Sequence, residues 1–83
     1  SDQAVKSLEN MRDKHNDRYN AKSKKVDMGT LKAVFRRGAG AFSQSHRPGQ
    51  SRGSWAMARV NMFLKMKRGG KVKKSYRDAV GDI

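Results

Sequence analysis

The residues best suited to chemistry gather in one short stretch, HRPGQSRGS, at positions 46–54. It combines arginines with serine hydroxyls and glycines, which together can hold a phosphate or carboxylate by charge-assisted hydrogen bonds and close backbone approach. A helix starting at residue 52 would add its free N–H groups and its dipole. The candidate anion-binding residues are Arg47, Ser51, Arg52, Gly53 and Ser54. The alternative is an ordinary capped loop between two helices.

The same stretch predicts a turn at Pro48 and Gly49. Proline fixes φ near −65° and glycine accepts a positive φ at the next position, as a type II turn requires. Proline also disfavours helical backbone at the residue before it, so the side chain of Arg47 should project outward.

The sequence contains only weak matches to catalytic, phosphate-cradling and metal-binding motifs. The RRGAGA run at 36–41 resembles a glycine nest, but at a helix C-terminus the dipole opposes anion binding. SQSH at 43–46 sets hydroxyls beside an imidazole, yet no acid lies within 28–77 to orient it. With two isolated histidines and no carboxylate pair, metal-dependent hydrolysis is disfavoured, and the absence of cysteine excludes cysteine zinc sites. We therefore expect no enzyme activity, no cofactor and no metal site.

The net charge of +13 comes from one segment. Residues 28–77 hold 13 Lys or Arg and no acid, while the 7 bases elsewhere balance all 7 acids. Such a segment repels itself on folding, so a polyanionic partner is the best reason to retain it; a merely solubilising surface usually mixes both signs. The further candidate phosphate-binding residues are Arg36, Arg37, Lys65, Arg68, Lys71, Lys73 and Lys74.

Two helices are expected to position these residues. Asp27 or Thr30 can cap a helix at about 28–38, which Gly38 and Gly40 should end. A second helix, at about 51–68, has Ser51 as its N-cap and stops at Gly69 and Gly70.

The predicted fold is all-α, a small helical domain built on this two-helix hairpin. Residues 28–83 form the basic domain, with an extended, strand-like tail from residue 69. Residues 1–27 form a basic, flexible or loosely helical arm, because their apolar stripe is thin and diluted by polar residues.

The second helix carries two apolar stripes. One should face the first helix and consists of Ala56, Met57, Val60, Phe63 and Leu64. The other lies on nearly the opposite side and consists of Trp55, Ala58, Met62 and Met66. A hairpin cannot bury both, so either the tail or the arm covers the second stripe, or a subunit or partner does. Trp55, Met62 and Met66 are therefore candidate interface residues, for self-association or a partner protein.

A resemblance covers about half of the chain. The stretch LKAVFRRGAGAFSQSHRPGQSRGSWAMARVNMFLKMKRGGK resembles a small uncharacterised domain encoded by tailed bacteriophages, notably those of marine bacteria. Its RRG-GA turn, RPG loop and W-MARVN-FL helix correspond here to Arg36–Ala41, Arg47–Gly49 and Trp55–Leu64. The domain is sometimes attached to larger phage proteins, including head-associated ones. The resemblance implies a phage setting, in the host bacterial cytoplasm or the virion.

The sequence thus predicts a phage-encoded nucleic-acid-binding module that contacts phosphates, with DNA preferred over RNA. The alternative is a virion or head-assembly component whose basic face meets packaged DNA or an acidic protein. A third interpretation, a membrane-surface or calmodulin-like target helix, is disfavoured by the phage setting. No apolar run approaches the roughly 20 residues of a membrane span, so we expect no membrane partner.

Overall fold

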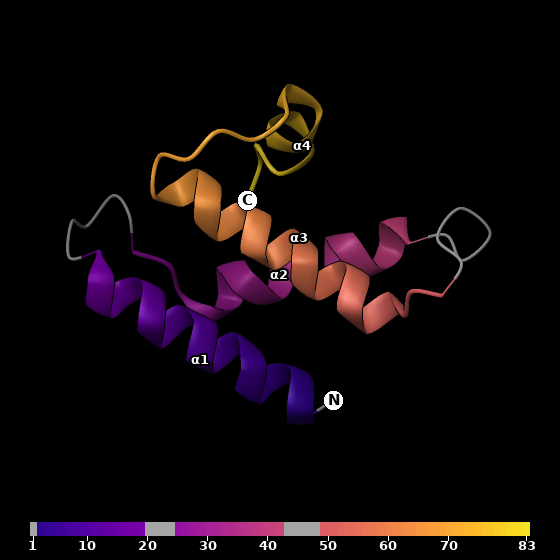
Figure 1. Ribbon diagram of the computed structural model, residues 1–83, viewed down its shortest axis with the longest axis horizontal. Helices are drawn as coiled ribbons and strands as arrows, with labels where there is room; N and C mark the ends of the chain where they lie inside the picture. The colour runs from indigo at the N-terminus through magenta and orange to yellow at the C-terminus, as the bar shows by residue number, and fades with distance from the viewer. Residues whose placement is uncertain (1, 20–24, 43–48) are drawn as a thin grey trace.

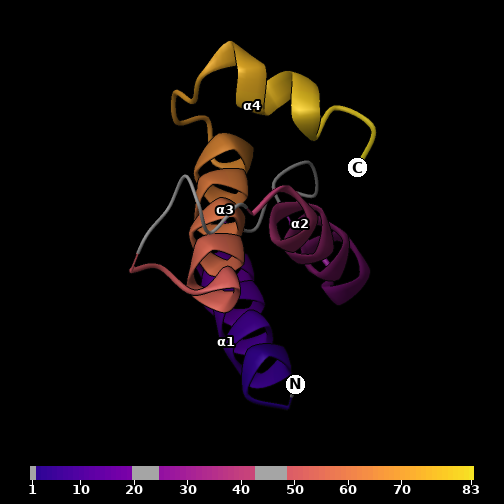
Figure 2. The ribbon, with the colours of Figure 1, turned by 90° about the vertical axis from the view of Figure 1, so that its right-hand side faces the viewer.

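The computed structural model describes residues 2–19, 25–42 and 49–83, and all regular structure within them is helical. The helices are α1 (Asp2–Arg18), α2 (Met28–Ala41), α3 (Arg52–Lys67) and α4 (Lys74–Ala79). The all-α prediction is confirmed. The central pair α2 and α3 is in extensive contact, and α1 and α4 lie on opposite sides of this pair (Figures 1 and 2).

The start of α2 follows the prediction, but its end does not. The Asp27 carboxylate accepts the Thr30 N–H at 2.7 Å, as an N-cap should. The helix then continues through Gly38 to Ala41. Gly38 is buried where α2 meets α3, and a Cβ there would lie 3.1 Å from the Cβ and Cγ of Arg59. Its role is to let the two helices approach closely, so the prediction that it ends the helix was wrong.

The second predicted helix is found almost as expected. Ser51 caps α3, with its hydroxyl accepting the Ser54 N–H at 3.1 Å. The inward arc is confirmed for Ala56, Val60, Phe63 and Leu64, which are buried, whereas its fifth member, Met57, is only partly buried against the core. The loop before α3 agrees where it is described, because Gly49 has the positive φ (82°) of the predicted turn. Arg47 and Pro48 lie outside the described residues.

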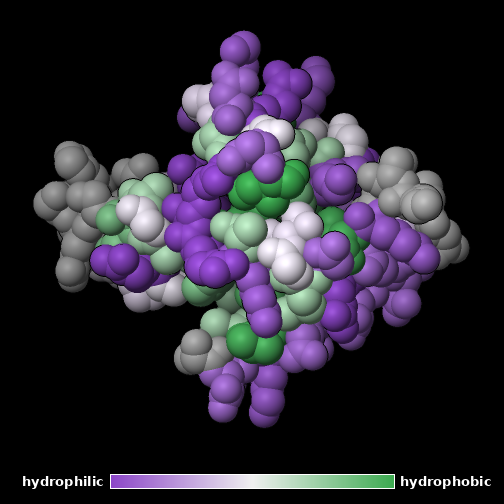
Figure 3. All heavy atoms as spheres, turned by 180° about the vertical axis from the view of Figure 1, so that it is seen from behind, coloured by the Kyte–Doolittle hydropathy of each residue, from purple (hydrophilic) through white to green (hydrophobic). Residues whose placement is uncertain are grey.

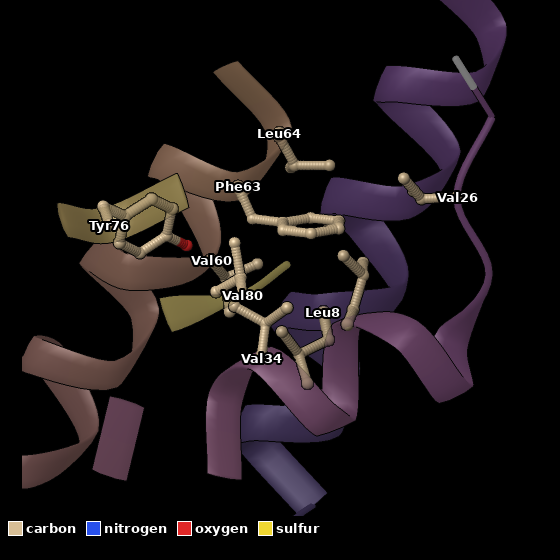
Figure 4. Packing of buried hydrophobic residues seen from close by; sticks show 9 residues of the cluster. Leu8, Val26, Val34, Val60, Phe63, Leu64, Tyr76 and Val80 are labelled. Carbon is tan, nitrogen blue, oxygen red and sulfur yellow. The ribbon is translucent and has the colours of Figure 1, made fainter. Parts of the chain in front are cut away.

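The core joins all four helices (Figure 4). Leu31 and Val60 have no exposed surface, and they lie where α2 and α3 meet. Around them pack Leu8 of α1, Tyr76 of α4 and residues flanking the helices. The buried apolar residues of this cluster are Leu8, Val26, Leu31, Val34, Val60, Phe63, Leu64, Tyr76 and Val80. Packing from both sides gives a small chain more buried apolar surface than a hairpin alone.

The segment predicted as an arm contains α1, a helix of 17 residues whose Leu8 is only 2% exposed. Two hydrogen bonds from the Asn16 side chain, called the Asn16 clasp below, link α1 to the backbone of Val26 just before α2. The Asn16 amide donates to the Val26 carbonyl at 2.8 Å, and its oxygen accepts the Val26 N–H at 2.9 Å. Residues 20–24 of the predicted arm lie outside the described part of the chain.

The predicted extended tail is wrong over residues 74–79, which form α4. Tyr76 and Val80 explain the difference. Residues four apart share one face of a helix, so helical backbone brings both side chains to the core, where each is 4% exposed. Across the described residues, no helix is long and apolar enough to span a membrane.

Candidate nucleic-acid interface

A hollow of about 380 Å³ lies between α3 and the segment that follows it. Its basic lining residues are Arg59, Lys65, Lys71 and Lys73. The rest of the lining consists of Trp55, Met62, Val72, Ser75 and Tyr76. None of these lining residues is an acid, so the hollow combines concentrated positive charge with aromatic and aliphatic surface.

The end of α3 creates this hollow by reversing the chain. Gly69 adopts a φ of +91°, which is inexpensive only for glycine. The Gly70 N–H donates to the Lys65 carbonyl at 2.8 Å, and the Gly69 N–H donates to the Met66 carbonyl at 3.1 Å. These two bonds form a Schellman motif. The chain therefore turns back, and residues 71–73 form a wall of the hollow together with α3.

Tyr76 of α4 also lines the hollow, and a hydrogen bond holds it against α3. Its hydroxyl donates to the backbone carbonyl of Arg59 at 2.6 Å, and the residue is only 4% exposed. Burial raises the pKa of the Tyr76 phenol, and the nearby Arg59 charge offsets part of that rise. The phenol therefore keeps its proton at neutral pH and remains a hydrogen-bond donor.

Arg59 lies within cation–π distance of two aromatic rings. Its guanidinium carbon lies 4.9 Å from the centroid of Trp55 and 5.2 Å from that of Tyr76. Both distances are within the range of cation–π attraction. The side chain is half-buried and also lines the hollow, so a planar cation is presented there in a restrained position.

Three of the predicted phosphate-binding residues come together here, namely Lys65, Lys71 and Lys73. Arg68 is exposed at the C-terminal end of α3. Lys74 is exposed in the first turn of α4, where its ammonium pairs with the Asp78 carboxylate at 2.9 Å. Arg68 and Lys74 are therefore not among the lining residues of the hollow, and phosphate binding by all five residues stays a prediction.

The two predicted arginines of α2 do not line the hollow. Arg37 pairs with the Asp82 carboxylate through its two terminal nitrogens, Nη1 and Nη2, and Nη1 also donates to the Ala79 carbonyl at 2.6 Å. That hydrogen bonding lowers the pKa of Asp82 and raises that of Arg37. Arg37 therefore makes an intramolecular contact between α2 and the C-terminal segment. Arg36 is exposed beside a separate hollow between α1 and α2.

The cluster predicted at the start of α3 is at the other end of that helix, which is about 24 Å long. Within it, the Ser54 N–H is taken by the Ser51 cap. Arg52 donates to the Ala39 carbonyl at 3.3 Å, at the end of α2. Gly53 has open space around it, since a Cβ added there would meet nothing within 4 Å. Anion binding by this cluster stays a prediction, separate from the hollow.

The second apolar stripe of α3 is partly covered from within the chain. Trp55 and Met62 line the hollow against Val72 and Tyr76, and Met66 packs against the core. Among the described residues, no large apolar side chain is fully exposed. In the view from behind, hydrophobic residues gather in the middle of the face and hydrophilic residues surround them (Figure 3). Self-association through Trp55, Met62 and Met66 stays a prediction.

Arg59 and Tyr76 line the hollow but were not among the predicted site residues. Trp55 and Arg59 are four residues apart on a helix, and that spacing places an arginine beside an aromatic ring. This signal was available in the sequence. The sequence did not show that Tyr76 would line the same hollow as Arg59, because its position depends on how the chain turns back after Gly69.

Comparisons with known proteins give a family but no described relative. Neither the curated proteins nor the solved structures contain a match to the chain. A family model does match it, over residues 4–83, which is nearly the whole sequence. The chain therefore belongs to the family described as "Family of unknown function (DUF5824)".

Proposed function

We propose that this protein is a nucleic-acid-binding module that contacts phosphates through the basic end of α3 and the segment after it. The observation that carries the proposal is the hollow lined by Arg59, Lys65, Lys71 and Lys73 with no acid among its lining residues. Four cations around one depression attract a polyanion, and the strongly basic segment 28–77 adds a long-range field of the same sign.

The aromatic part of the lining favours nucleic acid over a simple polyanion. Trp55, which is half-buried, supplies ring surface next to the cations, a combination common where bases and phosphates are bound together. On the sequence motifs, we place the module in a phage setting, in the host cytoplasm or the virion, with DNA as the preferred partner. We propose binding without catalysis.

Salt dependence of binding tests this proposal. The affinity of the whole chain for a fluorescein-labelled DNA oligonucleotide should fall steeply as salt rises, because each neutralised phosphate releases counterions. The double variant Lys71→Ala, Lys73→Ala should bind more weakly. Its plot of log association constant against log salt concentration should be less steep. The slope should shrink in magnitude by about one for each phosphate that the variant no longer neutralises.

A matched variant controls for net charge alone. Lys6→Ala, Lys25→Ala removes the same charge at two exposed positions away from the hollow. It should change the salt slope much less than the Lys71, Lys73 pair. Equal effects of the two double variants would show a diffuse attraction and reject the hollow as the binding site. Absence of binding at about 50 mM salt, where phosphate contacts are strong, would reject nucleic-acid binding itself.

A further inference from the structure

The hollow at the end of α3 has two chemically different walls. Lys65, Lys71 and Lys73 bring ammonium groups to it, and all three are exposed. Trp55, Met62 and Val72 are half-buried and give it an apolar wall. A ligand that matches both walls needs an anionic part and a flat or apolar part within one small unit.

Arg59 adds a flat cation to the apolar wall. Its contacts with the rings of Trp55 and Tyr76, at 4.9 and 5.2 Å from their centroids, limit its side-chain freedom before any ligand arrives. A restrained guanidinium loses less conformational entropy on binding than one in free solution. Guanidinium planes and indole rings are both surfaces on which nucleobases stack.

A nucleotide has the required combination, but only when its base is unpaired. In a duplex the bases are stacked inside and the phosphates face outward, so a duplex would meet the lysines and leave the apolar wall uncovered. A single strand can place a phosphate on the lysines and its base against Trp55 and Arg59. At about 380 Å³ the hollow is also in the size range of small-ligand sites.

We infer that the hollow receives an unpaired nucleotide, so that the protein prefers single-stranded to double-stranded nucleic acid. This inference rests on the proposed function and adds the strand state of the ligand. The base contributes affinity through stacking and the phosphates contribute through charge. Stacking on a ring or guanidinium suits every base, so the preference extends across sequences.

Three DNA probes of equal length separate these contributions. They are a single strand of about ten nucleotides, its duplex, and an abasic strand with the same phosphates and no bases. The single strand should bind about tenfold more tightly than the abasic strand, as expected for stacking of one base. Trp55 is the only tryptophan of the chain, so its fluorescence reports on the hollow. The single strand should quench it, and the duplex and abasic strand should not.

Arg59→Lys tests the planar cation while keeping the charge. Lysine also keeps the Cβ and Cγ that pack near Gly38, which favours an unchanged fold. The variant should lose about fivefold in affinity for the single strand and little for the abasic strand, since only stacking is removed. Arg18→Lys is the matched control, because Arg18 also lies over a ring, that of Tyr19, but on α1. It should bind all three probes as wild type does, and circular dichroism should show both variants folded.

The outcomes separate this inference from the proposed function. Equal affinity for the single and abasic strands would overturn the inference and leave phosphate binding intact. So would tighter binding of the duplex, or tight binding of the single strand with unchanged Trp55 fluorescence. Failure of all three probes to bind at low salt would overturn the proposed function and this inference together.

Discussion

Tyr76 of α4 donates its hydroxyl hydrogen to the backbone carbonyl of Arg59 on α3, with 2.6 Å between the two oxygens. Seventeen residues separate the partners along the chain. The bond fastens the C-terminal segment to α3 beside the hollow. The tail is therefore a structural part of the candidate interface as well as a source of positive charge.

Tyr76→Phe should lower the free energy of unfolding by about 1 kcal/mol, the usual net value of one hydrogen bond. The ring is retained, so packing against the core and the cation–π contact with Arg59 should survive. Urea unfolding followed by circular dichroism measures the change. A loss of about 3 kcal/mol or more, typical of an aromatic deletion, would mean that the hydroxyl also supports packing.

Alkaline pH should destabilise the protein through the same residue. Burial raises the pKa of Tyr76 above its ordinary value of 10.0. The stability that this shift represents is present below pH 10 and is lost as pH rises through the folded-state pKa. Thermal unfolding of wild type and Tyr76→Phe across this range should show a smaller alkaline loss in the variant. Parallel curves would contradict the assignment.

Gly38 and Gly40 of α2 should respond oppositely to larger side chains. Around Gly40 nothing lies within 4 Å of an added Cβ, so Gly40→Ala should stabilise the protein by about 0.5–1 kcal/mol through helix propensity. At Gly38 the added Cβ meets Arg59 atoms at 3.1 Å and the Ala56 Cα at 3.3 Å. Gly38→Leu should therefore destabilise by about 2 kcal/mol or more through overpacking. Denaturant unfolding of both variants checks the contrast, which equal effects would refute.

The Asn16 clasp should contribute to the free energy that holds α1 against the rest of the fold. Asn16→Ala removes two hydrogen bonds and leaves the partly buried Val26 N–H and carbonyl without them, at a cost of about 1–3 kcal/mol. Asn10→Ala, at an exposed position of the same helix, should cost less than about 0.5 kcal/mol. Amide hydrogen exchange along α1 would show whether the helix opens with the clasp. Equal costs at both positions would show that the clasp adds no stability.

Acid should weaken the contact between α2 and the C-terminal segment. The hydrogen bond from Arg37 lowers the pKa of Asp82 below its ordinary 3.8. That contribution is present above pH 3.8 and is lost as pH falls through the folded-state pKa. Asp82→Asn and Arg37→Ala should each reduce the acid-side loss of stability, and the double variant should add little. Because the pair is exposed, the effect should be small and should shrink as salt rises.

Local signals predicted the central hairpin well. Asp27 and Ser51 are each followed three residues later by the N–H that the cap receives, and Gly69 ends α3. These features depend on a few neighbouring residues, so the sequence contains the information needed to place them. Lys65, Lys71 and Lys73 were named as candidates from the acid-free charge of residues 28–77. The turn at Gly69, with its positive φ, is what brings them to one hollow.

Features set by contacts between distant residues were not predicted. Gly38 carries a helix-ending signal, yet the approach of Ala56 and Arg59 from α3 gives it a packing role instead. Residues 74–79 are too few for a stable isolated helix, and their helical state depends on the core that receives Tyr76. Arg37 looked like a free cation because its partner, Asp82, is 45 positions away.

The attachment of the C-terminal segment to two different helices has a consequence for the order of folding. Tyr76 is bonded to α3, whereas Ala79 and Asp82 are bonded to Arg37 of α2. These hydrogen bonds cannot all form until α2 and α3 have come together, so we predict that complete docking of α4 is a late event on the folding pathway. Substitutions at Tyr76 and Asp82 should then accelerate unfolding and leave the refolding rate nearly unchanged, the behaviour of residues with φ-values near zero.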